Sequence, residues 1–174
     1  MSALVRTLLS RITELERRIG GMNMKGRVTD VDPATKKVRF EIGQDEDGNP
    51  VKSPWMLVKQ RAGALKIFSM PSVGELVEGT SDCGDIAQGS VSPCHWTDDN
   101  QAPSDDAEVH KLTFGDVTFT LTGDGVLLEA GGVSYRFDGA GFVQQGGKQE
   151  HNGKNVGFDH KHVSAPPGAP GVVL

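Results

Sequence analysis

The second half of the chain carries a regular series of short apolar segments, each closed by glycine. The segments cover residues 112–114, 117–121, 126–128, 133–137 and 142–144. Large apolar residues alternate with polar ones in three of them, at 112–114, 117–121 and 133–137, and a new segment starts roughly every eight residues. This pattern predicts short strands joined by tight turns. Strands with one apolar face and a glycine turn at each corner are typical of stacked or helical β structure.

These segments are too poor in apolar residues to enclose a core of their own. Some 50 residues carry only about a dozen large apolar side chains, which one chain cannot arrange into a closed interior. Burial against the same faces of identical chains would resolve the shortage. The simplest closed arrangement is a three-sided prism with one chain on each side, so we expect a parallel homotrimer. A second small sandwich within one chain is the alternative.

The N-terminus has a different period. Apolar residues recur there at alternating steps of four and three, at Met1, Val5, Leu8, Ile12, Leu15 and Ile19. This is the heptad pattern of a coiled coil. With fewer than three heptads, the helix would add to an assembly held together elsewhere or dock on a partner protein. Packing of a plain amphipathic helix on its own domain is the other interpretation.

The ends of this helix can also be predicted. Ser2 suits the N-cap, so the helix should run from about Ser2 to Ile19, and Glu14 can pair with Arg18 one turn later. The pair Gly20-Gly21 should stop the helix by permitting a left-handed residue.

From Lys25 the apolar period becomes two, which is typical of strands. Expected strands cover residues 26–31, 37–42, 55–58, 65–68, 75–78 and 86–91, with an acidic loop at 44–50. Five or six short strands in about 70 residues predict a small β-barrel, such as an oligonucleotide/oligosaccharide-binding (OB) barrel. We expect Trp55 and Phe68 in its core. The alternative is that Trp55, Lys59, Arg61 and Lys66 form a basic, aromatic patch for single strands or sugars.

Composition limits the function. The net charge of −5 and the pI near 5.5 disfavour bulk binding of nucleic acid. No apolar run approaches the roughly 20 residues that span a bilayer, and no signal peptide is evident, so we expect synthesis and folding in the cytoplasm. Ten residues separate Cys83 from Cys94, and both are expected as free thiols. With His95 they make only a weak metal-binding pattern.

A His-x-His pair lies near the C-terminus. On a strand, Val156, Phe158, His160 and His162 share one face, so an apolar face ends in two imidazoles. The pair is either a set of surface histidines or part of a metal site, and one chain offers too few ligands to complete that site. A symmetric trimer would offer six imidazoles around one axis, which is an octahedral set.

Three motifs together resemble a known family. They are Pro71-Ser72-Val73-Gly74-Glu75, Gly84-Asp85-Ile86-Ala87-Gln88-Gly89 and the stretch from His151 to His162, which follow the heptad helix in this order. The chain resembles, over nearly its whole length, the baseplate assembly protein V family, the central tail spikes of contractile-tailed bacteriophages. The third motif is the most specific of the three.

The resemblance implies a mainly β fold in successive parts. These are an N-terminal helix (1–21), an OB-like β-barrel (22–95), a linker (96–108), an intertwined trimeric β-helix needle with its tip (109–163) and a C-terminal tail (164–174). It also implies that two histidines of each chain hold one iron ion at the tip, and His160 and His162 match that motif. Phe158 departs from the family, where a small polar residue is usual, which implies a drier layer behind the ion. The linker leaves no room for the lysozyme domain that some relatives insert.

The expected function is mechanical. A spike of this family pierces the host outer membrane and takes part in baseplate assembly, with the baseplate hub protein as its partner and the virion tail as its location. We expect no enzymatic activity and no nucleic-acid binding, because none of the five histidines lies in a recognisable hydrolase motif. The alternatives are an OB-type module that binds nucleic acid or sugar, and the spike of a phage-derived secretion machine.

Overall fold

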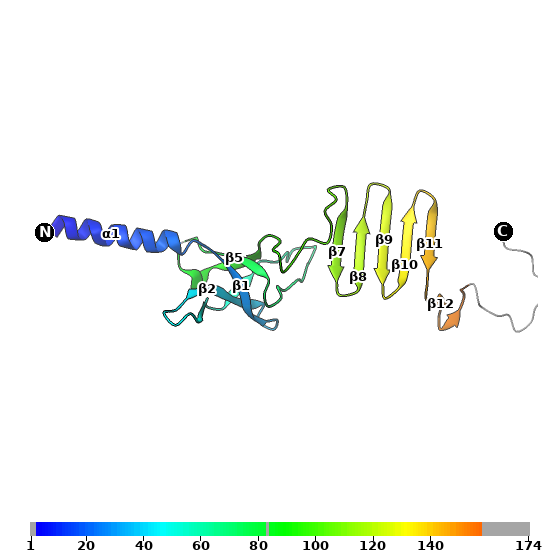
Figure 1. Cartoon of the computed structure of the whole chain (residues 1–174), viewed down its shortest axis with the longest axis horizontal. Helices are drawn as coiled ribbons and strands as arrows, with labels where there is room; N and C mark the ends of the chain where they lie inside the picture. The colour runs from blue at the N-terminus through cyan, green and yellow to red at the C-terminus, as the bar shows by residue number, and fades with distance from the viewer. Residues whose placement is uncertain (1–2, 83, 158–174) are drawn as a thin grey trace, which may run out of the picture. The chain divides into compact units, whose positions relative to one another are not determined.

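The protein divides into two compact units, with the boundary between Gln101 and Ala102. The structure is a computed structural model that describes residues 3–82 and 84–157. The first unit, here the barrel unit, contains α1 (Ala3–Gly20), β1 (Asn23–Asp32), β2 (Lys37–Gln44), β3 (Pro50–Lys52), β4 (Met56–Val58), β5 (Leu76–Thr80), the short 3-10 helix η1 (Ile86–Gln88) and β6 (Ser90–Pro93). The second, here the sheet unit, contains β7 (His110–Phe114), β8 (Val117–Leu121), β9 (Gly125–Ala130), β10 (Val133–Asp138), β11 (Gly141–Gln145), β12 (Glu150–His151) and β13 (Lys154–Asn155). Figure 1 shows this order of elements along the chain.

Helix α1 confirms that the N-terminal segment with the heptad pattern is helical. The expected pair of Glu14 and Arg18 is present at 2.7 Å, and Glu14 also binds Arg17 at 2.9 Å. Hydrogen bonds from Arg17 and then Arg18 lower the pKa of the Glu14 carboxyl to about 2. Within the described chain, no helix is long and apolar enough to cross a membrane.

The predicted left-handed stop of α1 is wrong. The helix ends at Gly20, but neither Gly20 nor Gly21 has a positive φ. The amide of Gly21 instead donates to the carbonyl oxygens of Arg17 and Arg18, both at 3.1 Å. A Cβ on Gly21 would lie 2.5 Å from the carbonyl oxygen of Gly84, so this glycine is required by close packing on the Gly84 turn.

Five strands of the barrel unit close into a barrel, as the sequence predicts. They follow the order β1-β5-β6-β4-β2, and β2 returns to pair with β1. All of these pairs are antiparallel except β4 with β6. Inward-facing side chains fill the interior, and the buried apolar ones are Val28, Val38, Phe40, Met56, Val58, Val77 and Val91. The fold is therefore OB-like.

Three details of the barrel prediction are wrong. The predicted strand over 86–91 begins instead as the 3-10 helix η1, and β6 starts only at Ser90. Residues 65–68 form no strand, and only a single bridge joins Ala62 to Lys66. The barrel strands already pair on both sides, so this segment finds no open edge among them. Phe68 is 66% exposed and Trp55 is 38% exposed, so neither belongs to the core.

Strands β7 to β11 form one antiparallel sheet in simple chain order (Figure 1). Each strand matches one of the predicted glycine-closed segments. The turn between β9 and β10 is Gly131-Gly132, and both residues have positive φ, which a two-residue hairpin turn of this kind requires. The described residues of this unit form a single layer, so they do not build the sandwich that was the alternative.

The hairpin of β12 and β13 bears on the strand that was expected to carry Val156 and the C-terminal histidines. Asn152 and Gly153 form the turn, with φ of 49° and 75°, and only residues 154–155 are a strand beyond it. Val156, the first residue of the face expected on a strand, lies just beyond the end of β13. The predicted face continues through Phe158, His160 and His162, which lie outside the described residues.

Barrel stability should be sensitive to Gly79. A Cβ there would lie 2.5 Å from Cζ of the buried Phe40 ring, so Gly79→Ala should lower the free energy of unfolding by about 1–3 kcal/mol through overpacking. Denaturant unfolding followed by tryptophan fluorescence measures this, because Trp55 and Trp96 both lie in the barrel unit. Gly63→Ala is the control, because a Cβ at this position would have no neighbour within 4 Å. It should change the free energy of unfolding by less than about 0.5 kcal/mol. Equal effects of the two variants would contradict the overpacking argument.

Candidate assembly interface

One face of the β7–β11 sheet is apolar across all five strands. Strand pairing places its residues in line, and we call this surface the apolar sheet face: Leu112, Phe114, Val117, Phe119, Leu121, Val126, Leu128, Ala130, Val133, Tyr135, Phe137 and Phe142. Phe114 is 89% exposed and Leu112 is 71% exposed, and Phe137 and Phe142 are also open to solvent. A contiguous exposed apolar surface of this kind marks an interaction site.

Cross-strand pairs make the apolar sheet face continuous. Phe119 lies between Leu112 on β7 and Leu128 on β9, and Leu128 in turn faces Tyr135. The rings of Tyr135 and Phe142 lie 5.9 Å apart between centroids and are tilted by 30°. Such pairs stabilise the sheet locally. They leave the outer surfaces of the same rings uncovered.

Gln144 is the polar residue at the β11 end of this row, opposite Tyr135. Its side-chain nitrogen donates to the carbonyl oxygen of Gly146 at 3.4 Å, whereas its side-chain oxygen is buried and has no hydrogen-bond partner in the structure. A buried acceptor without a donor costs about 1–3 kcal/mol. The alternation of residues in β11 places Gln144 on the apolar sheet face, and sequence reasoning did not single it out.

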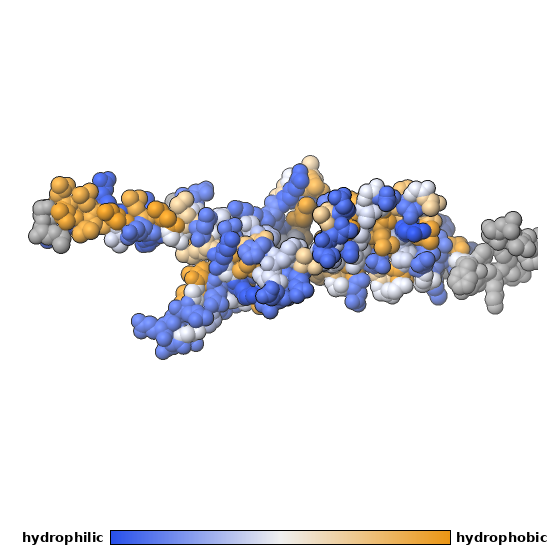
Figure 2. Space-filling model, turned by 45° about the horizontal axis from the view of Figure 1, so that its top comes forward, coloured by the Kyte–Doolittle hydropathy of each residue, from blue (hydrophilic) through white to orange (hydrophobic). Residues whose placement is uncertain are grey.

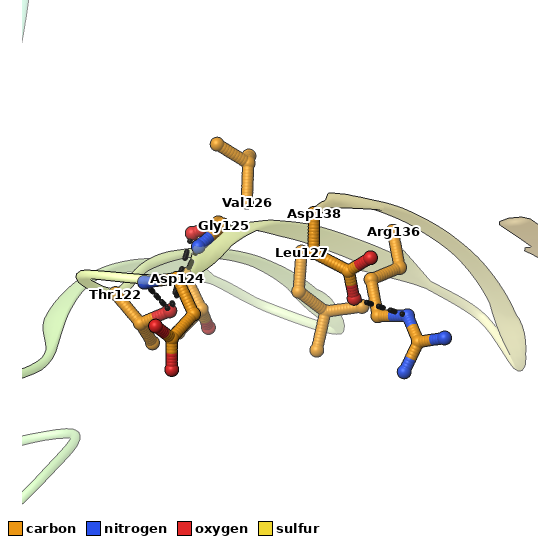
Figure 3. A pocket seen from close by; sticks show the side chains of 8 residues that line it. Thr122, Asp124, Gly125, Val126, Leu127, Arg136 and Asp138 are labelled. Atoms are coloured by element: carbon orange, nitrogen blue, oxygen red, sulfur yellow. Dashed lines mark hydrogen bonds and ion pairs between the residues drawn. The ribbon is translucent and has the colours of Figure 1, made fainter. Parts of the chain in front are cut away.

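The opposite face of the sheet is mostly polar, with Leu127 and Val143 as its large apolar residues. It carries Thr118, Thr120, Glu129, Ser134 and Arg136. A pocket of about 210 Å³ lies on it near the β8–β9 turn. Figure 3 shows Leu127 and Arg136 on the pocket side and Val126 pointing the other way.

The polar groups of this pocket bind one another. Arg136 and Asp138 form an ion pair at 3.1 Å, drawn dashed in Figure 3. The Thr122 hydroxyl accepts from the amides of Asp124 and Gly125, at 3.3 and 3.2 Å. These contacts hold the hairpin turn and the sheet edge in shape.

The basic, aromatic patch considered from the sequence is partly occupied by contacts within the barrel. The Arg39 guanidinium lies 5.2 Å from the centre of the Trp55 ring, so this ring already has a cation on it. The Lys59 ammonium donates to the Thr80 hydroxyl at 2.9 Å. Arg61 and Lys66 lie in the same small loop, closed by a hydrogen bond from the Ile67 amide to the Arg61 carbonyl oxygen.

The structure leaves the predicted metal site untested. His160 and His162 lie outside the described residues. Cys94 is a free thiol whose sulfur lies 3.1 Å from Nδ1 of His95, and Cys83 is also outside the described part. Over residues 3–82 and 84–157, no three His, Cys, Asp or Glu side chains are grouped to hold a metal ion.

The closed barrel defines the class of the first unit, an OB-like domain. Residues 24–96 match the family described as the type VI secretion system/phage-baseplate injector OB domain. This match confirms the resemblance to the baseplate assembly protein V family over the barrel. No curated protein matches the chain. The family match supports a structural role related to the baseplate.

Proposed function

We propose that this chain is the central spike of a contractile-tail baseplate, and that it pierces the host outer membrane as a parallel homotrimer. The apolar sheet face carries this proposal, because one chain leaves it open to water. In this proposal the protein is part of the virion tail and binds the baseplate hub protein. The spike of a phage-derived secretion machine is the second candidate, since the matched family covers both kinds of injector.

Association through this face is strongly favourable. Burying a Leu, Val or Phe side chain contributes about 1.5–3 kcal/mol, and more than ten residues of the face are apolar. Three sheets that turn this face to a common axis would form a closed prism, with the face that carries Arg136 and Asp138 on the outside. A partner chain would also bring donors to the buried oxygen of Gln144.

Trimer formation should depend on Phe137. Phe137→Asp would force three carboxylates into an apolar interior, so it should abolish the trimer. Sedimentation equilibrium of the unaltered protein should give about 55 kDa, three times the chain mass of 18.5 kDa. Thr113→Asp places the same charge at an exposed site on the polar face and should leave that mass unchanged. A monomeric or dimeric unaltered protein would contradict the proposal.

The donor set of the C-terminal motif fits an iron ion. Two imidazoles from each of three chains provide six nitrogen ligands, which suit an octahedral transition metal, whereas zinc prefers four ligands and calcium or magnesium prefers oxygen. His160 and His162 would hold the ion. Neutral imidazoles are required, because protonated ones would repel both the ion and one another. The ion would tie three chain ends together and so add stability.

Iron content tests this part of the proposal. Elemental analysis of untagged protein should give one iron per three chains, and His160→Ala or His162→Ala should remove it while the trimer persists. His95→Ala, which changes a histidine of the barrel unit outside the motif, is the control. Acidification below the usual imidazole pKa should release the metal, because the proton competes for the same nitrogen. No metal, or one metal per chain, would refute the shared site.

The proposed role needs no catalytic residue. Assays for cell-wall hydrolysis and nuclease activity should therefore show no turnover, and binding to single-stranded DNA at physiological salt should be weaker than micromolar. The Arg39 guanidinium on the Trp55 ring and the net charge of −5 support this expectation. Micromolar DNA binding that is lost in Trp55→Ala would favour the OB-type binding module instead.

A further inference from the structure

We propose that α1 forms a parallel, in-register, three-stranded coiled coil with α1 of two further copies of this chain, in which Arg11 pairs with Glu16 of the partner subunit. The inference rests on the proposed trimer. It assigns the apolar stripe of α1 to self-association, where the sequence alone left docking on another protein equally open. The stripe consists of Leu4, Val5, Leu8, Leu9, Ile12, Leu15 and Ile19.

The stripe is uncovered in the single chain. None of the described residues of α1 is buried, and all seven side chains of the stripe are exposed. Figure 2 shows this apolar surface in orange on the helix. The barrel unit therefore does not use the helix to complete its own core, which overturns the interpretation of a plain amphipathic helix packed on its domain.

The heptad positions fix how two such helices would meet. Val5, Ile12 and Ile19 take position a, and Leu8 and Leu15 take position d. In a parallel coiled coil, each residue at position g faces the residue five places later, at position e, of the neighbouring helix. The g residues are Leu4, Arg11 and Arg18. Leu9 and Glu16 are the e residues five places after Leu4 and Arg11, whereas the fifth place after Arg18 lies beyond the helix.

Both of these flanking pairs are complementary. Leu4 would pack on Leu9 of the partner subunit, and Arg11 would form an ion pair with Glu16 of the partner subunit. The structure shows no ion pair or hydrogen bond for the side chains of Arg11 and Glu16, whereas nearby Glu14 binds both Arg17 and Arg18. An antiparallel pairing would set g against g and e against e, so it would lose the match between Arg11 and Glu16.

The flanking leucines favour three strands over two. Branched residues at a with leucine at d suit a dimer when considered alone. Leu4 and Leu9, however, widen the stripe to both sides, and each helix of a three-stranded coil faces two neighbours that cover both flanks. The stripe is too short to be stable as an isolated coil, so it depends on the trimer formed elsewhere in the chain.

Disulfide trapping in the full chain tests the coil. In a Cys83→Ser, Cys94→Ser background, Leu8→Cys places a thiol at a d position, and Ser10→Cys places one at the outer f position as the control. In a parallel coil, Leu8→Cys should form interchain disulfides at least about tenfold faster than Ser10→Cys, because its thiols meet at the axis. Arg11→Glu should slow this reaction severalfold by setting like charges together, and adding Glu16→Arg should restore the rate.

Sedimentation of the same variants separates the two proposals. If the protein is a trimer but Leu8→Cys reacts no faster than Ser10→Cys, the coiled coil is overturned. The proposed function then still stands, and the stripe is assigned to binding another protein. A dimer that traps rapidly through Leu8→Cys overturns the three-stranded arrangement. A monomer overturns both the coil and the proposed trimer. If Leu8→Cys reacts rapidly, but adding Glu16→Arg to Arg11→Glu does not restore that rate, the pairing of Arg11 with Glu16 is overturned.

Discussion

The uncovered apolar face of the β7–β11 sheet is the constraint on which the assembly of this protein depends. A sheet with one apolar face must bury it against a second layer, and the described part of the chain supplies none. The barrel is different, because its strands curve around their own side chains and enclose Phe40, Met56 and the valines. The barrel therefore covers its core within a single chain, whereas the described part of the sheet unit leaves one apolar face for a second layer to cover.

The edges of the sheet add to this requirement. Within the described residues, β7 and β11 each pair on one side only, so their outer backbone groups are open to further strands. The closed barrel has no such edge among its five strands. In an intertwined trimer, face burial would supply most of the free energy, and edge hydrogen bonds would fix how the chains follow one another. Separating the chains would then require many contacts to break together, which suits a part that transmits force.

The parts that were predictable from the sequence are those set by neighbouring residues. Strands β7 to β11 follow one another through short turns, so alternation and Gly131-Gly132 were enough to locate them. The pair of Glu14 and Arg18 needs only one helical turn. Residues 65–68 alternate equally well, yet the closed barrel offers them no edge. Phe68 and Gly21 were misjudged for a related reason: tertiary packing determines their environment, and residue type alone does not show it.

Different parts of the chain would contribute different properties to the trimer. The apolar sheet face provides area, but area alone does not select parallel over antiparallel chains or fix their register. Charge and a heptad pattern do both, because a shift of one residue in α1 removes the a and d contacts and the match of Arg11 with Glu16 together. The helix contributes little free energy by itself. Its role would be to align three chains whose sheets supply the stability.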